Sequence, residues 1–160
     1  MSIAAFERVS QARYDLDLAS WESPMPLQEI PLPRRATGGS AGYDFFCPVE
    51  AVLHPGESLT VPTGIRCRIE PGWVLLIMPR SSMGFKYEVR LSNTVGVIDS
   101  DYYGAVNEGH ILIRLHNGGK KDFPLHRGDR LGQGLFLPYG LAEEDEVLAR
   151  RTGGLGSTGK

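Results

Sequence analysis

Cysteine is scarce in this sequence, and no long hydrophobic run is present. Cys47 and Cys67 are its two cysteines among 160 residues, and neither belongs to a Cys-x-x-Cys motif. Two thiols are too few for a disulfide-stabilised scaffold, so we expect both to be reduced in a cytosol-like compartment. The longest purely aliphatic run, residues 74–78, is far too short to cross a membrane, which requires about 20 apolar residues.

An excess of charge of one sign is also missing. Lys and Arg number 17 against 19 Asp and Glu, which gives a net charge of −2 and a pI near 6.1. A DNA- or RNA-binding domain is normally basic overall, so we expect no nucleic-acid partner, although backbone N–H groups can still form a local anion site. Glu7 and Arg8 stand where a signal peptide would need an apolar stretch. We therefore predict a soluble cytoplasmic protein, or one of the host cytoplasm if the sequence is viral.

Glycine is absent from the first 37 residues, where four prolines lie within residues 24–33 instead. Over the whole chain, glycine and proline make up 31 of 160 residues, or 19%, against an average of about 12%. This excess argues against long helical bundles and favours short strands joined by tight turns. We expect residues 1–37 to be an N-terminal extension with a proline-rich connector, residues 38–150 to be the folded β domain, and residues 151–160 to be a glycine-rich tail.

Short apolar or alternating runs separated by Pro and Gly fill the predicted domain. They cover residues 43–52, 58–61, 65–69, 73–78, 110–116 and 131–137, with residues 141–150 as a candidate last strand. Many strands at such short spacing are typical of a sandwich or barrel. We predict an all-β fold with at most one short helix, over residues 81–87. For residues 1–22 two alternatives stay open: a helix capped by Ser2, or a strand running through Tyr14 to Leu18.

Five clusters are more polar or richer in glycine than a scaffold requires. They are residues 40–44, 79–84, 93–104, 127–133 and 151–160. In the first, Asp44 can help to hold a hard cation through water, or can simply be a turn aspartate. In the second, Arg80 and two serines offer the guanidinium and N–H donors of an anion site, or equally form a solvated loop with a capping serine.

The cluster over residues 93–104 is the most informative. If its backbone is extended, Asp99 and Asp101 point to the same face, and such a carboxylate pair can act as a general base or hold a metal. The alternative is an exposed hairpin tip where acidic residues favour solvent. The fourth cluster contains an ordinary Gly-Asp turn, and the glycine-rich tail lacks the spacing of a Walker A loop, so a disordered terminus is its usual alternative.

In this order and at these intervals, the five clusters resemble the five motifs of the trimeric deoxyuridine triphosphatases (dUTPases). The resemblance runs from about residue 32 to residue 160 and is closest at Arg80-Ser81, residues 93–102, residues 128–130 and residues 156–159. It implies a jelly-roll-like β-clip subunit and a homotrimer with shared active sites. It also implies Mg²⁺-dependent hydrolysis of dUTP to dUMP and pyrophosphate, which keeps uracil out of DNA and supplies dUMP.

The resemblance further implies roles for individual residues. Asp99 would be the general base that activates the attacking water, and Asp44 would hold Mg²⁺ through water. Asp129 would orient Arg80, and Tyr102 would lie under the deoxyribose. The other residues implied to contact the uracil edge, the phosphates or both as part of a C-terminal lid are Arg80, Ser81, Ser82, Asn93, Gly96, Val97, Gln133, Arg151, Leu155, Gly156, Ser157 and Thr158.

Three features depart from the family pattern. Leu155 stands where the family usually has a phenylalanine stacked on uracil, and Ser82-Met83 replaces the usual Gly-Leu. The segment 105–110 is longer than the usual continuation of the third motif, so we expect a local insertion there. Each departure affects the expected affinity for the nucleotide, while the proposed base is retained.

Two other functions are compatible with parts of the pattern. A dCTP deaminase, or a bifunctional deaminase-dUTPase, shares the Arg-Ser-Ser sequence, but its motif continues to a further arginine where this chain reads Met-Gly-Phe. A dUTPase-like regulatory protein would bind a protein partner through the N-terminal extension or the loop over residues 105–110.

Overall fold

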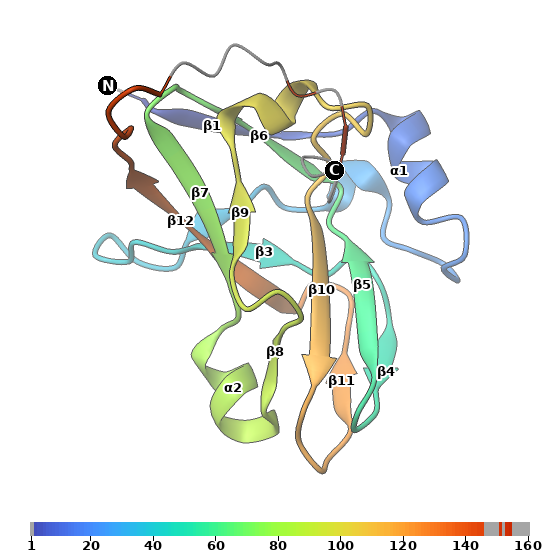
Figure 1. Cartoon of the computed structure of the whole chain (residues 1–160). Helices are drawn as coiled ribbons and strands as arrows, with labels where there is room; N and C mark the ends of the chain where they lie inside the picture. Colours follow the sequence, from blue (N-terminus) through green and yellow to red (C-terminus); the bar gives the residue numbers. More distant parts are fainter. Residues whose placement is uncertain (1, 146–150, 152, 155–160) are drawn as a thin grey trace.

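The computed structural model describes residues 2–145, 151 and 153–154 of the chain. Within these residues the fold is built almost entirely of β-strands, all paired antiparallel (Figure 1). The predicted all-β class is confirmed. Two short α-helices are present rather than at most one: the expected helix α2 (Ser81–Tyr87) and the additional helix α1 (Gln11–Asp17).

Four sheets make up the β structure, and the largest carries most of the predicted motifs. Its five strands lie in the order β2-β3-β12-β7-β9; a three-stranded sheet has the order β5-β10-β8, and β1-β6 and β11-β4 form two pairs. The elements in chain order are β1 (Ala4–Arg8), α1, the 3-10 helix η1 (Leu27–Glu29), β2 (Arg34–Arg35), β3 (Tyr43–Phe46), β4 (Ala51–Leu53), β5 (Ser58–Pro62), β6 (Ile65–Ile69), β7 (Trp73–Met78), α2, β8 (Val89–Leu91), β9 (Gly96–Ile98), the 3-10 helix η2 (Ser100–Gly104), β10 (Leu112–Asn117), β11 (Phe123–Leu125) and β12 (Arg130–Pro138).

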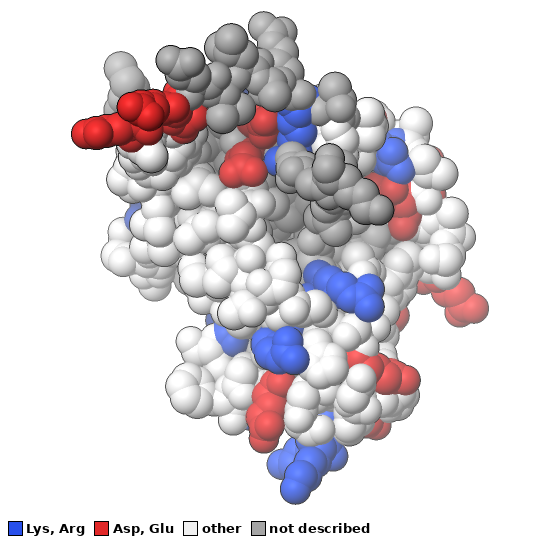
Figure 2. Space-filling model, viewed as in Figure 1, with Lys and Arg blue, Asp and Glu red and all other residues white. Residues whose placement is uncertain are grey.

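The core lies between the sheets and is filled by residues that alternate along the strands. Ile111, Ile113 and Leu115, two apart along the chain, are each at most 1% exposed, as their period of two predicts. Phe45 and Leu75 from the five-stranded sheet are also fully buried. The alternation therefore places polar and charged residues on the outer faces, where the two signs of charge are interspersed (Figure 2).

The N-terminal residues belong to the same fold, in contrast to the expectation that the folded body begins near Gly38. Strand β1 pairs with β6, from Ala4 opposite Ile69 to Arg8 opposite Ile65. In Figure 1 the two strands run together along one end of the molecule. β1 is the only strand that pairs with β6 in the described structure, and Ile65 of β6 also bonds to Thr63 and Ile111.

Helix α1 follows β1 directly and packs on the core. Ser10 caps it, because the Ser10 side chain accepts a hydrogen bond from a backbone N–H of the first turn. Tyr14 and Leu18 are both 3% exposed, and the Tyr14 hydroxyl donates to the Met25 carbonyl at 2.6 Å. Neither alternative left open for this segment is realised, since the cap is Ser10 rather than Ser2 and the residues from Tyr14 to Leu18 form no strand.

The connector over residues 23–37 is likewise attached to the core. It contains η1 and β2, and its Leu27 and Ile30 side chains are 2% and 0% exposed. At the other end of the chain, residues 141–145 form no strand, and residues 146–150 of the expected last strand lie outside the described residues. None of the described helices has the length and apolar character needed to span a bilayer.

Candidate active site

A pocket of about 700 Å³ gathers residues of the first, second and fourth clusters. Strand β12 lies between β3 and β7, so Gln133 sits opposite Asp44 on one side and opposite Met78 on the other. The chain leaves β7 at Pro79, whose carbonyl accepts a hydrogen bond from Gln133 Nε2 at 3.3 Å. Charged and polar groups in the lining are Ser40, Asp44, Arg80, Ser81, Ser82, Arg130 and Gln133.

Asp44 is the buried carboxylate of this pocket. It is 8% exposed, with Arg80 Nε 3.5 Å from Oδ1 and Arg130 Nε 3.4 Å from Oδ2. Two guanidinium groups thus compensate a carboxylate that would be costly to bury alone. Because one aspartate serves two arginines, the pocket has an excess of positive charge that suits an anion.

The partner of Arg80 differs from the one implied by the resemblance. Asp129 is exposed and accepts a hydrogen bond from the His126 N–H at 2.9 Å, which closes the turn before β12. Within the described residues no ion pair joins Asp129 to Arg80 of the same chain. The expected orienting role of Asp129 is thus not seen within one chain, where Asp44 holds the guanidinium instead.

The start of α2 borders the same pocket. Arg80 occupies the N-cap position with extended backbone, and no side chain caps the helix. The Met83 N–H bonds to the Arg80 carbonyl at 3.0 Å, so it is the N–H groups of Ser81 and Ser82 that an anion in the pocket can accept from. Ser81 and Ser82 are exposed and line the pocket, as the second cluster predicts.

A second, smaller pocket of about 170 Å³ lies against β9. Gly96 forms part of its wall, and a Cβ at this position would lie 3.3 Å from Ile77 Cβ, so the backbone is closely packed there. Asn93 and Val97 are exposed at the pocket. The lining, which is mostly apolar, consists of Ile77, Leu91, Ser92, Asn93, Gly96, Val97, Ile98, Leu112 and Arg114.

Ser92 is a candidate site residue that the sequence analysis missed. Its Oγ atom is buried and has no hydrogen-bond partner within the described part of the chain. A buried hydroxyl without a partner is unfavourable, and this one lines the small pocket. The only sequence signal was its position directly before Asn93, which is too weak to identify it.

Asp99 and Asp101 share one cationic partner. Asp99 is the N-cap of η2, so the backbone turns immediately after it instead of staying extended. Both carboxylates nevertheless reach Arg151, whose Nη1 is 3.1 Å from Asp99 Oδ2 and 3.5 Å from Asp101 Oδ1. The two acidic side chains are each a little over half exposed, so the pair is open to solvent.

Tyr102 lies directly behind this acidic pair. Its side chain is buried, the Arg151 guanidinium lies 5.1 Å from its ring centroid, and its hydroxyl donates to the His110 carbonyl at 2.8 Å. Burial raises the pKa of Tyr102, so the hydroxyl stays protonated and continues to donate. Arg151 thus lies over the ring that the resemblance places under the deoxyribose.

Arg80 and Asp99 lie at opposite ends of strand β7. Ile98, the residue before Asp99, pairs with Leu75, which is five residues before Arg80. Asp99 therefore lies beside Val74, six residues before Arg80, so at about 3.3 Å per residue the two functional positions are separated by about 20 Å along the strand. Figure 1 shows the same arrangement, with α2 at one end of β7 and the turn after β9 at the other. One chain therefore does not bring all the predicted site residues together.

Comparison with known proteins assigns the chain to a family. The sequence model described as dUTPase matches residues 28–159, which is most of the chain. The chain belongs to the dUTPase family. It is 41% identical to the deoxyuridine 5'-triphosphate nucleotidohydrolase of Lactococcus lactis over 133 residues, which cover 81% of this chain and 89% of that protein. For the Shigella sonnei dUTPase the identity is 39%, with 83% of this chain and 90% of that protein covered.

Solved dUTPase structures have the same fold. The crystal structure of the Streptococcus mutans dUTPase superposes with a TM-score of 0.70 and 34% identity, covering 87% of this chain and 98% of that one. A dUTPase from phage phi11 of S. aureus, in which a structural Mg(II) ion is coordinated, gives a TM-score of 0.68 at 20% identity. The predicted jelly-roll dUTPase fold is thus confirmed. The predicted lid residues Leu155, Gly156, Ser157 and Thr158 lie outside the described residues.

Proposed function

We propose that this dUTPase hydrolyses dUTP to dUMP and pyrophosphate, with Asp99 as the general base. The observation that carries the proposal is the position of Asp99 directly after β9, whose Gly96 and Ile98 line the small pocket. A base bound in that pocket would direct its sugar and α-phosphate toward the residues that follow β9. Asp99 is half exposed and can therefore reach a water molecule on that side.

Recognition of uracil would use the small pocket. The backbone at Gly96 and Val97 and the side chain of Asn93 would pair with the uracil edge, and Ser92 Oγ would gain the partner that it lacks. The close packing of Gly96 on Ile77 leaves little room for the extra methyl group of thymine. Tyr102 would lie beneath the deoxyribose, where a 2′-hydroxyl would clash with it.

The triphosphate would occupy the larger pocket. Arg80, Ser81, Ser82 and Gln133 would contact its oxygens, and Arg151 would join them as part of the lid formed by residues 151–160. Phosphoryl transfer demands little covalent chemistry from the protein, so positioning and charge neutralisation would supply most of the rate. The excess of guanidinium groups around Asp44 supports this assignment.

The residues present fit a magnesium ion that is bound mainly by the nucleotide. No group of three or more His, Cys, Asp or Glu residues that could enclose a metal occurs in the described parts of the chain. Asp44 is a single carboxylate in the phosphate pocket, so it would hold Mg²⁺ through water while triphosphate oxygens are its direct ligands. When bound, the ion would neutralise charge on the phosphates.

The chemical step would then proceed through Asp99. Arg151 first leaves the carboxylate, because the attacking water has to take that place. The oxygen of the water attacks the α-phosphorus while Asp99 accepts a proton from that water. The bond from the α-phosphorus to the bridging oxygen breaks, and that oxygen leaves with pyrophosphate, giving dUMP.

The proposal includes a homotrimer whose sites combine residues of different chains. Arg80 and Asp99 lie about 20 Å apart along β7, farther than the reach of one α-phosphate and its attacking water. A second chain that brings its Asp99 to the Arg80 of the first removes this separation. The symmetry of such an assembly would repeat the same combined site at each interface.

The two free thiols fit a reducing compartment. Cys47 and Cys67 are both buried and unpaired. Burial raises the pKa of Cys47 to about 11 and that of Cys67 to about 12, so both remain protonated and unreactive. We therefore extend the proposal to a cytoplasmic location.

One assay tests the proposed reaction. The protein is incubated with Mg²⁺ and dUTP, dCTP, dTTP or UTP in separate reactions, and the products are resolved by chromatography. We expect pyrophosphate and dUMP from dUTP, with turnover of the other three at least 100-fold slower, as close shape selection provides. Deamination of dCTP, or no pyrophosphate from dUTP, would overturn the proposal.

A further inference from the structure

The residues before position 28 lie outside the match to the dUTPase sequence model, yet they contact the turn that carries the proposed base. We propose that Glu7 and Asp17 are positioning residues, which hold η2 and therefore Asp99 through Tyr103 and His110. This inference rests on the proposed function for its effect on turnover. The contacts themselves do not depend on it.

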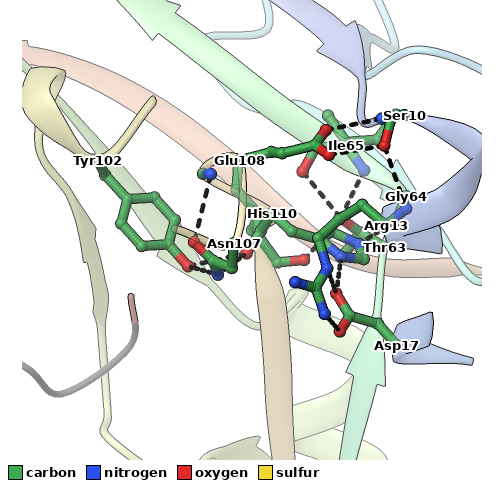
Figure 3. A network of polar contacts seen from close by, with 12 residues as sticks. Ser10, Arg13, Asp17, Thr63, Gly64, Ile65, Tyr102, Asn107, Glu108 and His110 are labelled. Carbon is green, nitrogen blue, oxygen red and sulfur yellow. Dashed lines mark hydrogen bonds and ion pairs between the residues drawn. The ribbon is translucent and has the colours of Figure 1, made fainter. Parts of the chain in front are cut away.

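The first contact joins α1 to a fully buried histidine (Figure 3). His110 is 0% exposed, and its Nδ1 lies 2.5 Å from Asp17 Oδ2 while its Nε2 lies 2.7 Å from the Gly64 N–H. Because that N–H can only donate, Nε2 must be the acceptor and Nδ1 must carry the proton. Burial lowers the pKa of His110, so the ring stays neutral and donates to Asp17.

His110 is in turn attached to η2. Its carbonyl accepts a hydrogen bond from the Tyr102 hydroxyl at 2.8 Å, and the same hydroxyl accepts one from Asn107 Nδ2 at 2.8 Å. Figure 3 shows Tyr102 and Asn107 on one side of His110 and Asp17 on the other. The loop over residues 105–110 thus connects α1 with Tyr102, three residues after Asp99.

A second pair of bonds fixes the loop on α1. Glu108 accepts hydrogen bonds from the Ser10 N–H at 2.8 Å and from the Ser10 hydroxyl at 2.6 Å. These bonds lower the pKa of Glu108, so the carboxylate remains ionised. The loop over residues 105–110 is therefore bonded to the start of α1 through Glu108 as well as to Asp17 through His110.

The other residue of the turn is held by β1. The Tyr103 hydroxyl donates to Glu7 Oε2 at 2.7 Å, and Arg66 Nη2 lies 3.2 Å from the same oxygen. The Arg66 guanidinium also lies 4.4 Å from the centroid of the Tyr103 ring. Adjacent tyrosines of η2 are thus tied to two different N-terminal elements.

These attachments matter because η2 is only five residues long. A 3-10 helix of this length is not stable in isolation, so its position depends on the packing of its side chains. A displacement of about 1 Å in a reacting group can cost up to about 100-fold in rate. The N-terminal contacts are therefore expected to affect kcat, whereas the uracil and phosphate pockets, which they do not line, would still bind dUTP.

The test compares substitutions on α1. Asp17→Ala removes the acceptor of His110, and Asp17→Asn retains an acceptor. Asp15→Ala makes the same change at an exposed position, where the carboxylate accepts a hydrogen bond from Gln11. We expect Asp17→Ala to lower kcat about tenfold with KM within twofold of wild type. Asp17→Asn should recover kcat to within about threefold, and Asp15→Ala should leave it unchanged. Calorimetry with the α,β-imido analogue of dUTP gives the number of binding sites per chain. A lower kcat with an unchanged number of sites means slower turnover, whereas fewer sites mean loss of folded protein.

A milder variant and a measurement independent of activity complete the test. Tyr103→Phe removes only the hydroxyl bonded to Glu7 and should lower kcat about two- to threefold without unfolding the protein. Hydrogen exchange should be faster over residues 99–105 in Asp17→Ala than in Asp15→Ala.

Unchanged kcat in a folded Asp17→Ala protein, or a loss of activity matched by an equal loss of binding sites, would overturn the inference. If the wild type releases no pyrophosphate from dUTP, the proposed function fails. The positioning role then fails with it, while the exchange data still show whether the contact orders the turn.

Discussion

Arg151 Nη1 lies 3.1 Å from Asp99 Oδ2, so the proposed base is paired with a cation from the C-terminal segment. The Arg151 side chain is 11% exposed and that of Asp99 is 54% exposed, which leaves the carboxylate accessible to water. Because water reaches the exposed Asp99 side of this ion pair, an incoming triphosphate can replace the carboxylate as the partner of Arg151. The same arginine is then free to contact phosphate.

Removal of the base should abolish turnover without abolishing binding. We expect Asp99→Asn to lower kcat by about 1,000-fold, because both proton acceptance and water orientation are lost. Asp101→Asn is the matched control, since it makes the same change on the same turn beside the same arginine. Steady-state kinetics should show less than a fivefold effect for the control. Equal effects of the two substitutions would remove Asp99 from its role.

Two inactive variants should restore each other when they assemble together. Because Arg80 and Asp99 lie at opposite ends of β7, the proposed trimer takes them from different chains. Co-expressed Arg80→Ala and Asp99→Asn chains should regain about a quarter of wild-type activity, which is the fraction of intact sites in random trimers. Each variant expressed alone is the control. Mixed trimers without activity would show that each site is formed by one chain.

Ser92→Ala should weaken nucleotide binding and stabilise the free protein. The buried Oγ atom has no partner among the described residues, and such a group costs about 1–3 kcal/mol. We expect the free energy of unfolding to rise by about 1 kcal/mol and the Kd of the imido analogue to increase about fivefold. Urea titration and calorimetry measure the two quantities. An unchanged Kd would mean that Ser92 does not contact the nucleotide.

Gly64→Ala should destabilise the attachment of the N-terminal segment. Gly64 has a φ of +75°, and a Cβ there would lie 2.8 Å from Ile30 Cδ1 and 3.2 Å from Leu27 Cδ1. Gly56 has a φ of +81° with no atom within 4 Å of a Cβ, so Gly56→Ala isolates the backbone strain. We expect a loss of about 1 kcal/mol at Gly56 and a further 1–3 kcal/mol from overpacking at Gly64, measured by urea denaturation. Equal losses would contradict the close packing.

Stability should fall as the pH is lowered below about 6.5, the ordinary pKa of histidine. Burial lowers the pKa of His110, so the unfolded chain takes up a proton that the native protein does not, and unfolding is favoured by up to about 1.4 kcal/mol per pH unit. His54 and His126 act in the opposite direction, because Asp122 and Glu50 raise their pKa values. Denaturation of the His54→Gln/His126→Gln variant between pH 7.5 and 5.5 isolates the His110 contribution. A stability independent of pH in this range would contradict it.

The sequence identifies elements that are defined by local signals. The strand Trp73–Met78 and the helix Ser81–Tyr87 occur with the predicted bounds. Pro79 ends the strand, and the residues after Arg80 form the short helix. Ile65–Ile69 is likewise predicted to the residue, since its alternation matches a strand with one buried face. In each case the neighbouring residues contain the information needed.

Contacts between distant segments were not predictable in the same way. The helix α1 has only seven residues, too few for its hydrophobic periodicity to be recognised. Its Tyr14 packs near Gly64, which is 50 residues away in the sequence, and no local pattern predicts that contact. The pairing of Asp44 with Arg80 depends on β12 lying between β3 and β7, a strand order that differs from the chain order. The Asp99–Arg80 separation follows from the β7–β9 register, which no sequence motif reports.

The hydrogen bond between Asp17 and His110 can form only after residue 110 has been synthesised. The two residues are 93 positions apart. At ribosomal rates of about 5–20 residues per second, His110 is therefore added roughly 5 to 20 seconds after Asp17. During that interval Asp17 has no buried partner to bind, although β6 can already have accepted β1. One of the first helices of the chain would therefore complete its docking only after about two-thirds of the 160 residues have been synthesised.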